Sequence, residues 1–415
     1  MLKVNKCIFL SLFIFLIIQP FFVVHSDDNF ALIPQELNAS DILTESEING
    51  PNYTIGDLVL NDGAINFYTF TSDYGNVVAE GIAQLHMRIA EFKAIGAMEE
   101  MDRKEVFGDS LKAGLKAPVE GVKSLVKEPI ATTKAAGRGI GQFMSNISRS
   151  IVSGGDPDQD NTISVLTGYD VAKRQFAYEL NINPYTDNII AREYLAQISK
   201  AAVAGGITPK VALAAIDSGV ATAASLTATT QSMKELVRDN PPGKLDKINR
   251  EKLLAMGVSE GLSEAFLDNY HYDPYEETIL VGELESLDGV DGRQNYIQVA
   301  VRADADSVAQ YYRVKAMMFG AYHTNVEKIK EIRLLPDSGT AYIINKAGKL
   351  IVLAPVDDLF WTAELDLWLD KFSTNTIKDK EFWVSGRFSS QARSEFEKRG
   401  YVVVENAEKE LLKDL

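Results

Sequence analysis

The sequence predicts a mainly helical protein with a small α/β part. Apolar residues recur at helical spacing over much of 81–332, and residues 108–151 repeat a basic pattern every eleven residues. Beyond residue 336 the spacing changes to the alternation of strands. We therefore expect an N-terminal β-hairpin, an 11-residue amphipathic repeat, a multi-helix region, and a C-terminal hairpin followed by a βαβ unit.

Residues 1–26 have the pattern of a signal peptide. Lys3 and Lys6 precede the apolar stretch 7–24, and residues 24–26 offer small side chains for cleavage. An uncleaved anchor helix is the alternative, because 18 apolar residues are at the short limit for crossing a bilayer. We expect an exported protein of the periplasm or cell envelope. Its only cysteine, Cys7, would be lost with the signal, so the mature chain would have no disulfide.

Residues 27–104 are expected to form an extended arm, a β-hairpin and a helix. The polar stretch 27–51 has little periodicity. Residues 66–71 and 76–80 alternate on either side of a Ser-Asp-Tyr-Gly turn, which is typical of a hairpin. A long amphipathic helix over 81–103 is indicated by the helical spacing of Ile82, Leu85, Ile89, Phe92, Ile95 and Met98.

Residues 105–151 contain the basic amphipathic repeat. Eleven residues make almost three helical turns, so equivalent positions stay on one face. The fifth position is basic in the first three of the four units and the ninth in all four, and apolar residues lie beside them. Such a helix can lie on a membrane surface or an apolar protein. The predicted binding residues are Lys112, Lys116, Lys123, Lys127, Lys134 and Arg138 on the cationic stripe, and Leu111, Leu115, Val122 and Val126 on the apolar face.

The repeat has a simpler interpretation, in which its apolar face packs on other helices of the same protein. Pro118 and Pro129 also argue against one long rigid helix, because each removes a backbone donor. The charge distribution favours a membrane. The chain has a net charge of −16, whereas residues 103–150 hold nine basic and four acidic side chains. We expect an anionic membrane surface or an apolar protein as partner, and no nucleic acid, which the acidic body would repel.

Residues 152–163 are expected to be an acidic linker that includes a weak calcium site. Asp156, Asp158 and Asp160 alternate, so their carboxylates can point at one hard cation. Thr167 stands where a calcium loop carries its closing glutamate, and Pro157 also departs from that pattern. A solvated linker is the alternative, and no other cofactor is expected.

The remaining chain divides into a helical domain, 164–335, and a small α/β domain, 336–415. Apolar spacing predicts helices over 169–180, 188–204, 210–227, 244–256, 260–269, 275–287, 293–303 and 307–332. The C-terminal part is expected to form a hairpin of 341–345 and 349–354, a helix over 360–371, a strand over 381–385, a helix over 389–399 and a strand over 401–405.

Two stretches carry a resemblance to known sequences. Residues 169–188, YDVAKRQFAYELNINPYTDN, and residues 382–393, FWVSGRFSSQAR, resemble exported bacterial proteins of no assigned activity. The likeness covers most of the mature chain. It implies export from a bacterial cell and supplies no catalytic residues.

Two glycine-containing strings match catalytic or phosphate-binding motifs only in their letters. Residues 257–261, GVSEG, match the nucleophile-elbow string, but a helix precedes Ser259 where that motif needs a strand. Ser259 fits the N-cap of the next helix better. The glycine-rich residues 137–141 lie inside the repeat and also lack a preceding strand.

The leading functional prediction is therefore an exported, non-catalytic envelope protein whose repeat engages a membrane surface or an apolar partner. The alternative is a hydrolase with a pocket around His271, His323 and the tyrosine-rich connection 270–277. A surface connection between helices would also explain that segment. Asp357 and Asp358 resemble a carboxylate pair, although an acidic helix start explains them equally well.

Overall fold

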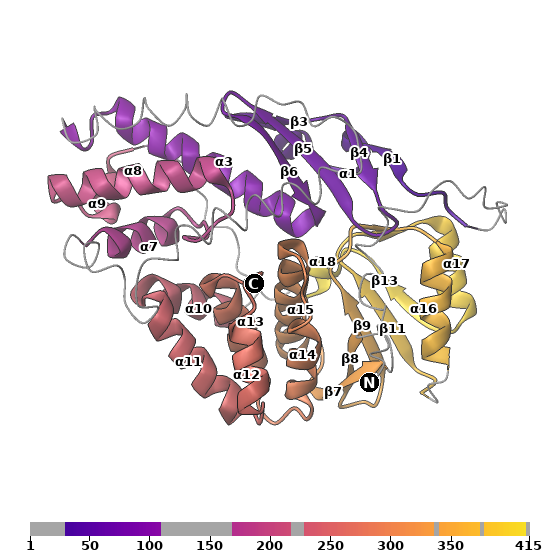
Figure 1. Ribbon diagram of the computed structural model, residues 1–415. Helices are drawn as coiled ribbons and strands as arrows, with labels where there is room; N and C mark the ends of the chain where they lie inside the picture. Colours follow the sequence, from indigo (N-terminus) through magenta and orange to yellow (C-terminus); the bar gives the residue numbers. More distant parts are fainter. Residues whose placement is uncertain (1–29, 109–167, 217–227, 336–339, 374–376, 412–415) are drawn as a thin grey trace, which may run out of the picture.

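The structure is a computed structural model that describes residues 30–108, 168–216, 228–335, 340–373 and 377–411. The predicted signal segment, nearly all of the repeat and the acidic linker lie outside these ranges. Two β-sheets and the helices packed on them make up the described chain (Figure 1).

The N-terminal sheet is antiparallel and has its longest strand, β5, in the middle. β5 pairs with β6 along its whole length, and with β4 and β3 near its two ends. Its strands are β1 (Gln35–Asn38), β2 (Asn49–Gly50), β3 (Tyr53–Ile55), β4 (Leu58–Asn61), β5 (Asn66–Ser72) and β6 (Gly75–Glu80). Two one-turn helices, α1 (Ala39–Ile42) and α2 (Glu45–Ile48), connect β1 to β2.

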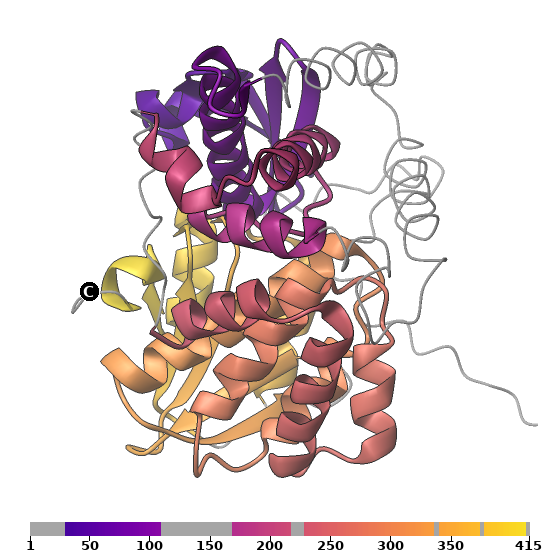
Figure 2. The same cartoon turned by 90° about the vertical axis from the view of Figure 1, so that its left-hand side faces the viewer.

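The first core lies between this sheet and a layer of helices. The long helix α3 (Gly81–Arg103) packs on β5 and β6, and α8 packs on α3. Aromatic rings join the two layers, with the ring centres of Phe70 and Phe92 5.5 Å apart. The other helices of this layer are α7 (Tyr169–Glu179), α8 (Ile189–Gly205) and α9 (Pro209–Ala214). The layer and its sheet sit together above the rest of the molecule in Figure 2.

The second sheet has the strand order β13-β11-β9-β8-β7. β9, β11 and β13 are parallel, and β7 and β8 continue the sheet in antiparallel fashion. These strands are β7 (Ile329–Leu335), β8 (Thr340–Asn345), β9 (Leu350–Ala354), β11 (Lys380–Val384) and β13 (Tyr401–Val404). The short strands β10 (Asp358–Leu359) and β12 (Arg387–Phe388) pair beside it.

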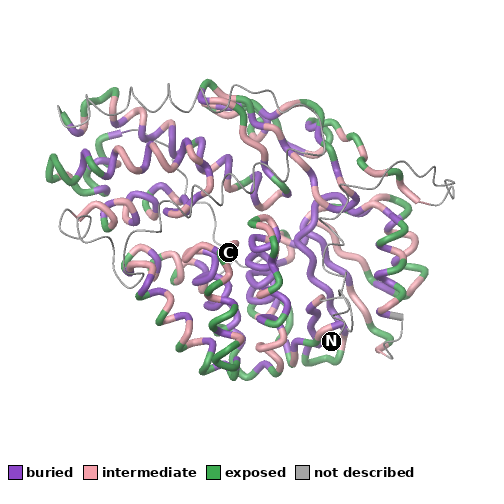
Figure 3. Tube along the Cα trace, viewed as in Figure 1, coloured by how far each residue is buried: buried purple, intermediate pink, exposed green. Residues whose placement is uncertain are grey.

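Helices cover both faces of the second sheet, so this half has three layers. One face carries α16 (Ala363–Ser373) and α17 (Ser390–Lys398), which connect its parallel strands (Figure 1). The opposite face carries the second core, in which α15 is almost fully buried (Figure 3). The helices on this side are α10 (Ala228–Asp239), α11 (Pro242–Ala255), α12 (Glu260–Leu267), α13 (Pro274–Ser286), α14 (Arg293–Ala300), α15 (Asp306–Asn325) and α18 (Ala407–Leu411).

The predicted fold class, mainly α with a small α/β part, is wrong. Helices do not dominate, because sheets of six and five strands organise the two halves. The stretch 27–51, expected to be an extended arm, contains β1, two short helices and β2. Such elements have too few residues to show a period. The helix expected over 307–332 ends at Asn325, and Ile329–Leu335 forms β7 because it pairs with β8.

Several individual elements are confirmed. The hairpin of β5 and β6 turns at the predicted position, and α3 has the predicted bounds, Gly81–Arg103. The C-terminal βαβ unit is formed by β11, α17 and β13. None of the helices in the described ranges combines the length and the hydrophobicity needed to cross a bilayer.

Candidate functional site

Most of the binding residues predicted from the sequence cannot be placed. The repeat residues Lys112, Lys116, Lys123, Lys127, Lys134, Arg138, Leu111, Leu115, Val122 and Val126 lie outside the described residues, as do the calcium candidates Asp156, Asp158 and Asp160. Within the described part of the chain, no group of acidic, histidine or cysteine side chains could hold a metal ion. Calcium binding by the acidic linker therefore stays a prediction.

The two histidines of the predicted hydrolase pocket lie at opposite ends of α15. His271 Nδ1 lies 2.7 Å from Asp306 Oδ1, beside the first turn of the helix. His323 Nδ1 accepts a hydrogen bond from the Ile329 backbone at 3.2 Å, beyond the last turn. A helix of 20 residues is roughly 30 Å long at about 1.5 Å per residue. The fold therefore does not bring these histidines into one pocket.

Ser259 occupies the N-cap position of α12, as the sequence predicts. The preceding segment is the helix α11, which stops at Gly257 with a φ of +83°. The strand that a nucleophile elbow requires is therefore not there. The Ser259 side chain makes no capping hydrogen bond, so Ser259 is the N-cap residue of α12 without its hydroxyl capping the helix.

Asp357 and Asp358 join the two halves of the molecule. The Asp357 carboxylate accepts hydrogen bonds from the backbone nitrogens of Asn66 and Ile82, both at 2.7 Å. Asp358 pairs with Arg387 at 2.7 Å and accepts a hydrogen bond from the Asn66 side chain at 2.8 Å. Asp357 therefore caps the first turn of α3 through the Ile82 backbone nitrogen, and not the start of a helix near it in the sequence. These contacts are structural.

A pocket that the sequence did not predict lies between α15, α16 and the second sheet. About 20 Å³ inside it is open to the centre of a water-sized molecule, and the wider hollow of about 350 Å³ includes open solvent. Tyr311 and Thr340 are half-buried at its rim, whereas the other lining side chains are buried. The pocket is lined by Tyr311, Lys315, Thr340, Val352, Ala354, Val356, Leu359, Leu365, Trp368 and Phe382.

Among the lining side chains that the structure describes, Lys315 and Tyr311 are the two ionisable ones. Only 1% of its surface is exposed. Its ammonium forms no hydrogen bond or ion pair with any residue that the structure describes. Lys315 Nζ lies over the Tyr311 ring, 5.7 Å from the ring centre, in a cation–π contact. Thr340 Oγ1 accepts a hydrogen bond from Trp368 Nε1 at 3.2 Å. The walls around the lysine are thus almost entirely apolar.

Burial lowers the pKa of the Lys315 ammonium to about 7, because an apolar pocket disfavours the charged form. At neutral pH about half of these side chains would be uncharged, compared with fewer than roughly one in a thousand for an exposed lysine. An uncharged amine is a nucleophile and a base. A lysine in such surroundings therefore has the chemical properties of a reactive group.

The pocket lies where α/β proteins commonly bind ligands. Ala354 ends β9, and Thr340 begins the neighbouring antiparallel strand β8, so both mark the carboxyl end of β9. Ligands of α/β sheets bind outside the carboxyl ends of the parallel strands. A purely structural buried lysine would usually have a carboxylate partner. The described residues give Lys315 none, which favours a functional role for the pocket.

Sequence analysis missed this site because its lining comes from residues between 311 and 382. The sequence predicts the helix around position 315. The one local sign of the pocket is the lysine itself, at a position that the helix buries. Lys315 follows Val314 and precedes Ala316, Met317 and Met318, so it is a second cation, two residues after Arg313, at the start of an apolar run. Comparisons with protein families, curated proteins and solved structures give no match to this chain. The predicted likeness to exported bacterial proteins therefore stays a prediction.

Proposed function

We propose that the pocket binds a small, largely apolar carbonyl compound and that Lys315 forms a Schiff base with it. The observation that supports this proposal is a buried lysine, without an anionic partner among the described residues, in an apolar pocket at the carboxyl end of β9. Schiff-base lysines are activated in this way, by desolvation in a hydrophobic site.

The reaction needs only the amine and the carbonyl compound. The lone pair of the neutral Lys315 Nζ attacks the carbonyl carbon, and the carbonyl oxygen takes up a proton as the nitrogen loses one. The resulting carbinolamine loses its hydroxyl group and the remaining N–H proton as one water molecule, which leaves a carbon–nitrogen double bond. No oxidant or reductant takes part. The apolar walls limit the access of water, which would reverse the reaction.

The pocket walls restrict the kind of compound. Leu365, Trp368 and Phe382 offer apolar contact, and the described part of the lining contains no second cation. A substrate with an additional carboxylate or phosphate would leave that charge without a partner, which is costly in apolar surroundings. The small volume favours a short chain. We therefore expect aldehydes or ketones of a few carbon atoms.

Reductive trapping tests this proposal. The protein is incubated at pH 7 with propanal and cyanoborohydride, which reduces an imine to a stable amine, and the modified lysines are identified by peptide mass mapping. We expect Lys315 to be modified at least about ten times faster than exposed lysines, because far more of its amine is uncharged. The advantage should shrink at pH 10, where exposed lysines also lose their protons.

Two variants complete this experiment. Lys315→Met should remove the fast adduct, whereas Lys346→Met, which changes an exposed lysine, should leave it unchanged. If the exposed lysines react at pH 7 while Lys315 stays unmodified in the folded protein, the proposed function is wrong.

A second proposal rests on the sequence alone. From the basic amphipathic repeat we propose that the protein is exported and that residues 105–151 engage an anionic membrane surface or an apolar partner. The pattern of the repeat is what supports it. Binding by the repeat and chemistry at Lys315 would be separate properties of one chain.

A further inference from the structure

Two further cations, the buried Arg313 and the half-buried Lys234, lie where the helices of the first core meet those of the second. Arg313 on α15 is 7% exposed. Two of its nitrogens face sulfur atoms, Met317 Sδ at 3.3 Å and Met87 Sδ at 3.9 Å. Its Nε has no hydrogen-bond partner, and the nearest carboxylate oxygen, on Glu276, lies 3.9 Å away. A guanidinium normally directs its five donors at oxygen atoms, so this one is poorly satisfied.

Carboxylates near Arg313 offset its charge only in part. Burial raises the pKa of Glu276 well above its usual value, which favours the uncharged acid. Asp273 accepts hydrogen bonds from the backbone nitrogens of Tyr275 and Glu276 and from the Asn183 side chain. Asp187 pairs with Arg88 at 2.6 Å. Glu276 therefore offers Arg313 little negative charge, and Asp187 and Asp273 already have other hydrogen-bond partners.

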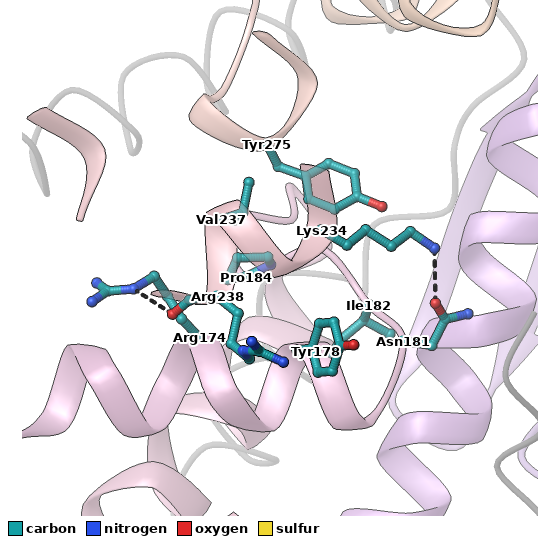
Figure 4. A pocket seen from close by; sticks show the side chains of 9 residues that line it. All are labelled: Arg174, Tyr178, Asn181, Ile182, Pro184, Lys234, Val237, Arg238 and Tyr275. Carbon is teal, nitrogen blue, oxygen red and sulfur yellow. Dashed lines mark hydrogen bonds between the residues drawn. The ribbon is translucent and has the colours of Figure 1, made fainter. Parts of the chain in front are cut away.

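Lys234 on α10 is a second poorly satisfied cation beside Arg313. Its Nζ donates to the amide oxygen of Asn181 at 3.0 Å and has no carboxylate partner among the described residues. Burial, and then the positive charge of Arg313, lower the pKa of Lys234 to about 8. The Tyr275 hydroxyl forms no hydrogen bond with the residues that the structure describes. Figure 4 shows this hydroxyl and the Lys234 amine pointing to the same side of a pocket.

The pocket has walls from both cores. α7 and the turn after it contribute Tyr178, Asn181 and Pro184, and α10 and the start of α13 contribute Lys234, Val237 and Tyr275. Ile182, Arg174 and Arg238 complete its lining; Arg174 Nε donates to the Arg238 carbonyl oxygen at 3.4 Å, and the Arg238 guanidinium lies 4.5 Å from the Tyr178 ring centre. The lining therefore combines cationic and aromatic side chains with the apolar Ile182, Pro184 and Val237.

We propose that this pocket binds a small oxyanion, such as inorganic phosphate or a short carboxylate, through the Lys234 ammonium and the Tyr275 hydroxyl. Arg313, which lies outside the pocket lining, adds positive charge near Lys234. A bound anion would give both groups a hydrogen-bond acceptor and would offset the repulsion between Lys234 and Arg313. It would also connect α7 of the first core to α10 and α13 of the second. The site is separate from the Lys315 pocket and does not depend on the function proposed for it.

The probe for the test is inorganic phosphate, added to the full chain at low ionic strength and measured by calorimetric titration. High phosphate stabilises proteins without binding, by exclusion from their surface, so direct binding at low concentration is the quantity needed. We expect saturable binding that Lys234→Met weakens at least about tenfold, because one charge-assisted hydrogen bond is lost. Tyr275→Phe should weaken it about threefold.

Two further variants keep this test decisive. Lys244→Met removes the same charge from an exposed position on α11 and should leave phosphate binding unchanged. Asn181→Asp places a carboxylate on Lys234 in place of the amide, so it should compete with phosphate and weaken binding even if Lys234→Met does not fold. The proposal is overturned if phosphate does not bind at millimolar concentration, or if it binds equally well to Lys234→Met or to Asn181→Asp.

Discussion

Replacing Lys315 with methionine is expected to stabilise the folded protein by about 4 kcal/mol at pH 7. In the unfolded chain the lysine has an ordinary pKa of about 10.4, whereas burial lowers it to about 7 in the folded protein. Each unit of this difference corresponds to about 1.4 kcal/mol of cost for folding with a charged lysine. Methionine has a similar volume and no charge, so it removes that cost and keeps the pocket filled.

The pH dependence of the free energy of unfolding shows in which direction Lys315 acts. Between pH 7 and about 10.4 the unfolded chain binds one more proton at this position than the folded protein does, so the free energy of unfolding rises with pH. Urea unfolding of the wild type should show a rise of up to about 1.4 kcal/mol per pH unit from this group, and Lys315→Met should lack that contribution. Lys346→Met serves as the matched control. Equal or lower stability of Lys315→Met at pH 7 would contradict the account.

Arg88→Met should have the opposite effect and destabilise the protein by about 3 to 5 kcal/mol, because it leaves the buried Glu91 carboxylate and the half-buried Asp187 carboxylate without their cation. Arg88 on α3 is 3% exposed. It lies 2.9 Å from Glu91 Oε2 and 2.6 Å from Asp187 Oδ2, and so connects α3 to the segment before α8. Glu91 also accepts hydrogen bonds from the side chains of Thr186 and Asn188.

Urea unfolding at pH 7 measures this effect. Arg103→Met is the matched control, because Arg103 is an exposed arginine at the end of the same helix. It should change the free energy of unfolding by less than about 0.5 kcal/mol. A loss below about 1 kcal/mol for Arg88→Met would show that the buried pairs do not hold these two segments together.

The outcome of these experiments also separates stability from function at the lysine pocket. A residue retained for chemistry often lowers stability, whereas a residue retained for structure raises it. Lys315 is expected to lower stability and to react with aldehydes, and Arg88 is expected to raise stability only. A lysine that stabilised the fold would be better explained by a structural role.

The sequence could predict those parts of the fold that local patterns determine. α3 shows its helical period over 23 residues, and the β5–β6 hairpin has its turn residues between two alternating runs. The first residues of β7, 329–332, fall within the helix expected over 307–332, because the strand character of β7 depends on pairing with β8. The two-residue strands β2, β10 and β12 are too short for any period to be visible.

The candidate site lay beyond sequence analysis for a related reason. Lys315 becomes unusual only when α16 and the second sheet close around it, and the lining residues of these elements lie 25 to 67 positions further along the chain. Arg88 and Asp187 likewise meet only in the folded protein. Spacing along the chain identifies faces of helices and strands, but it does not identify which faces meet. Exposed motifs such as GVSEG were easier to find and proved to be helix boundaries.

The pKa of Lys315 in the folded protein is the most direct test of the central claim. The chain can be labelled with ¹³C at lysine Cε, and the Lys315 signal can be assigned as the one missing from Lys315→Met. Its chemical shift is then followed by NMR from pH 5 to pH 11. The account predicts a midpoint near 7, well separated from the other lysines. A midpoint above about 10, like that of an exposed lysine, would contradict it.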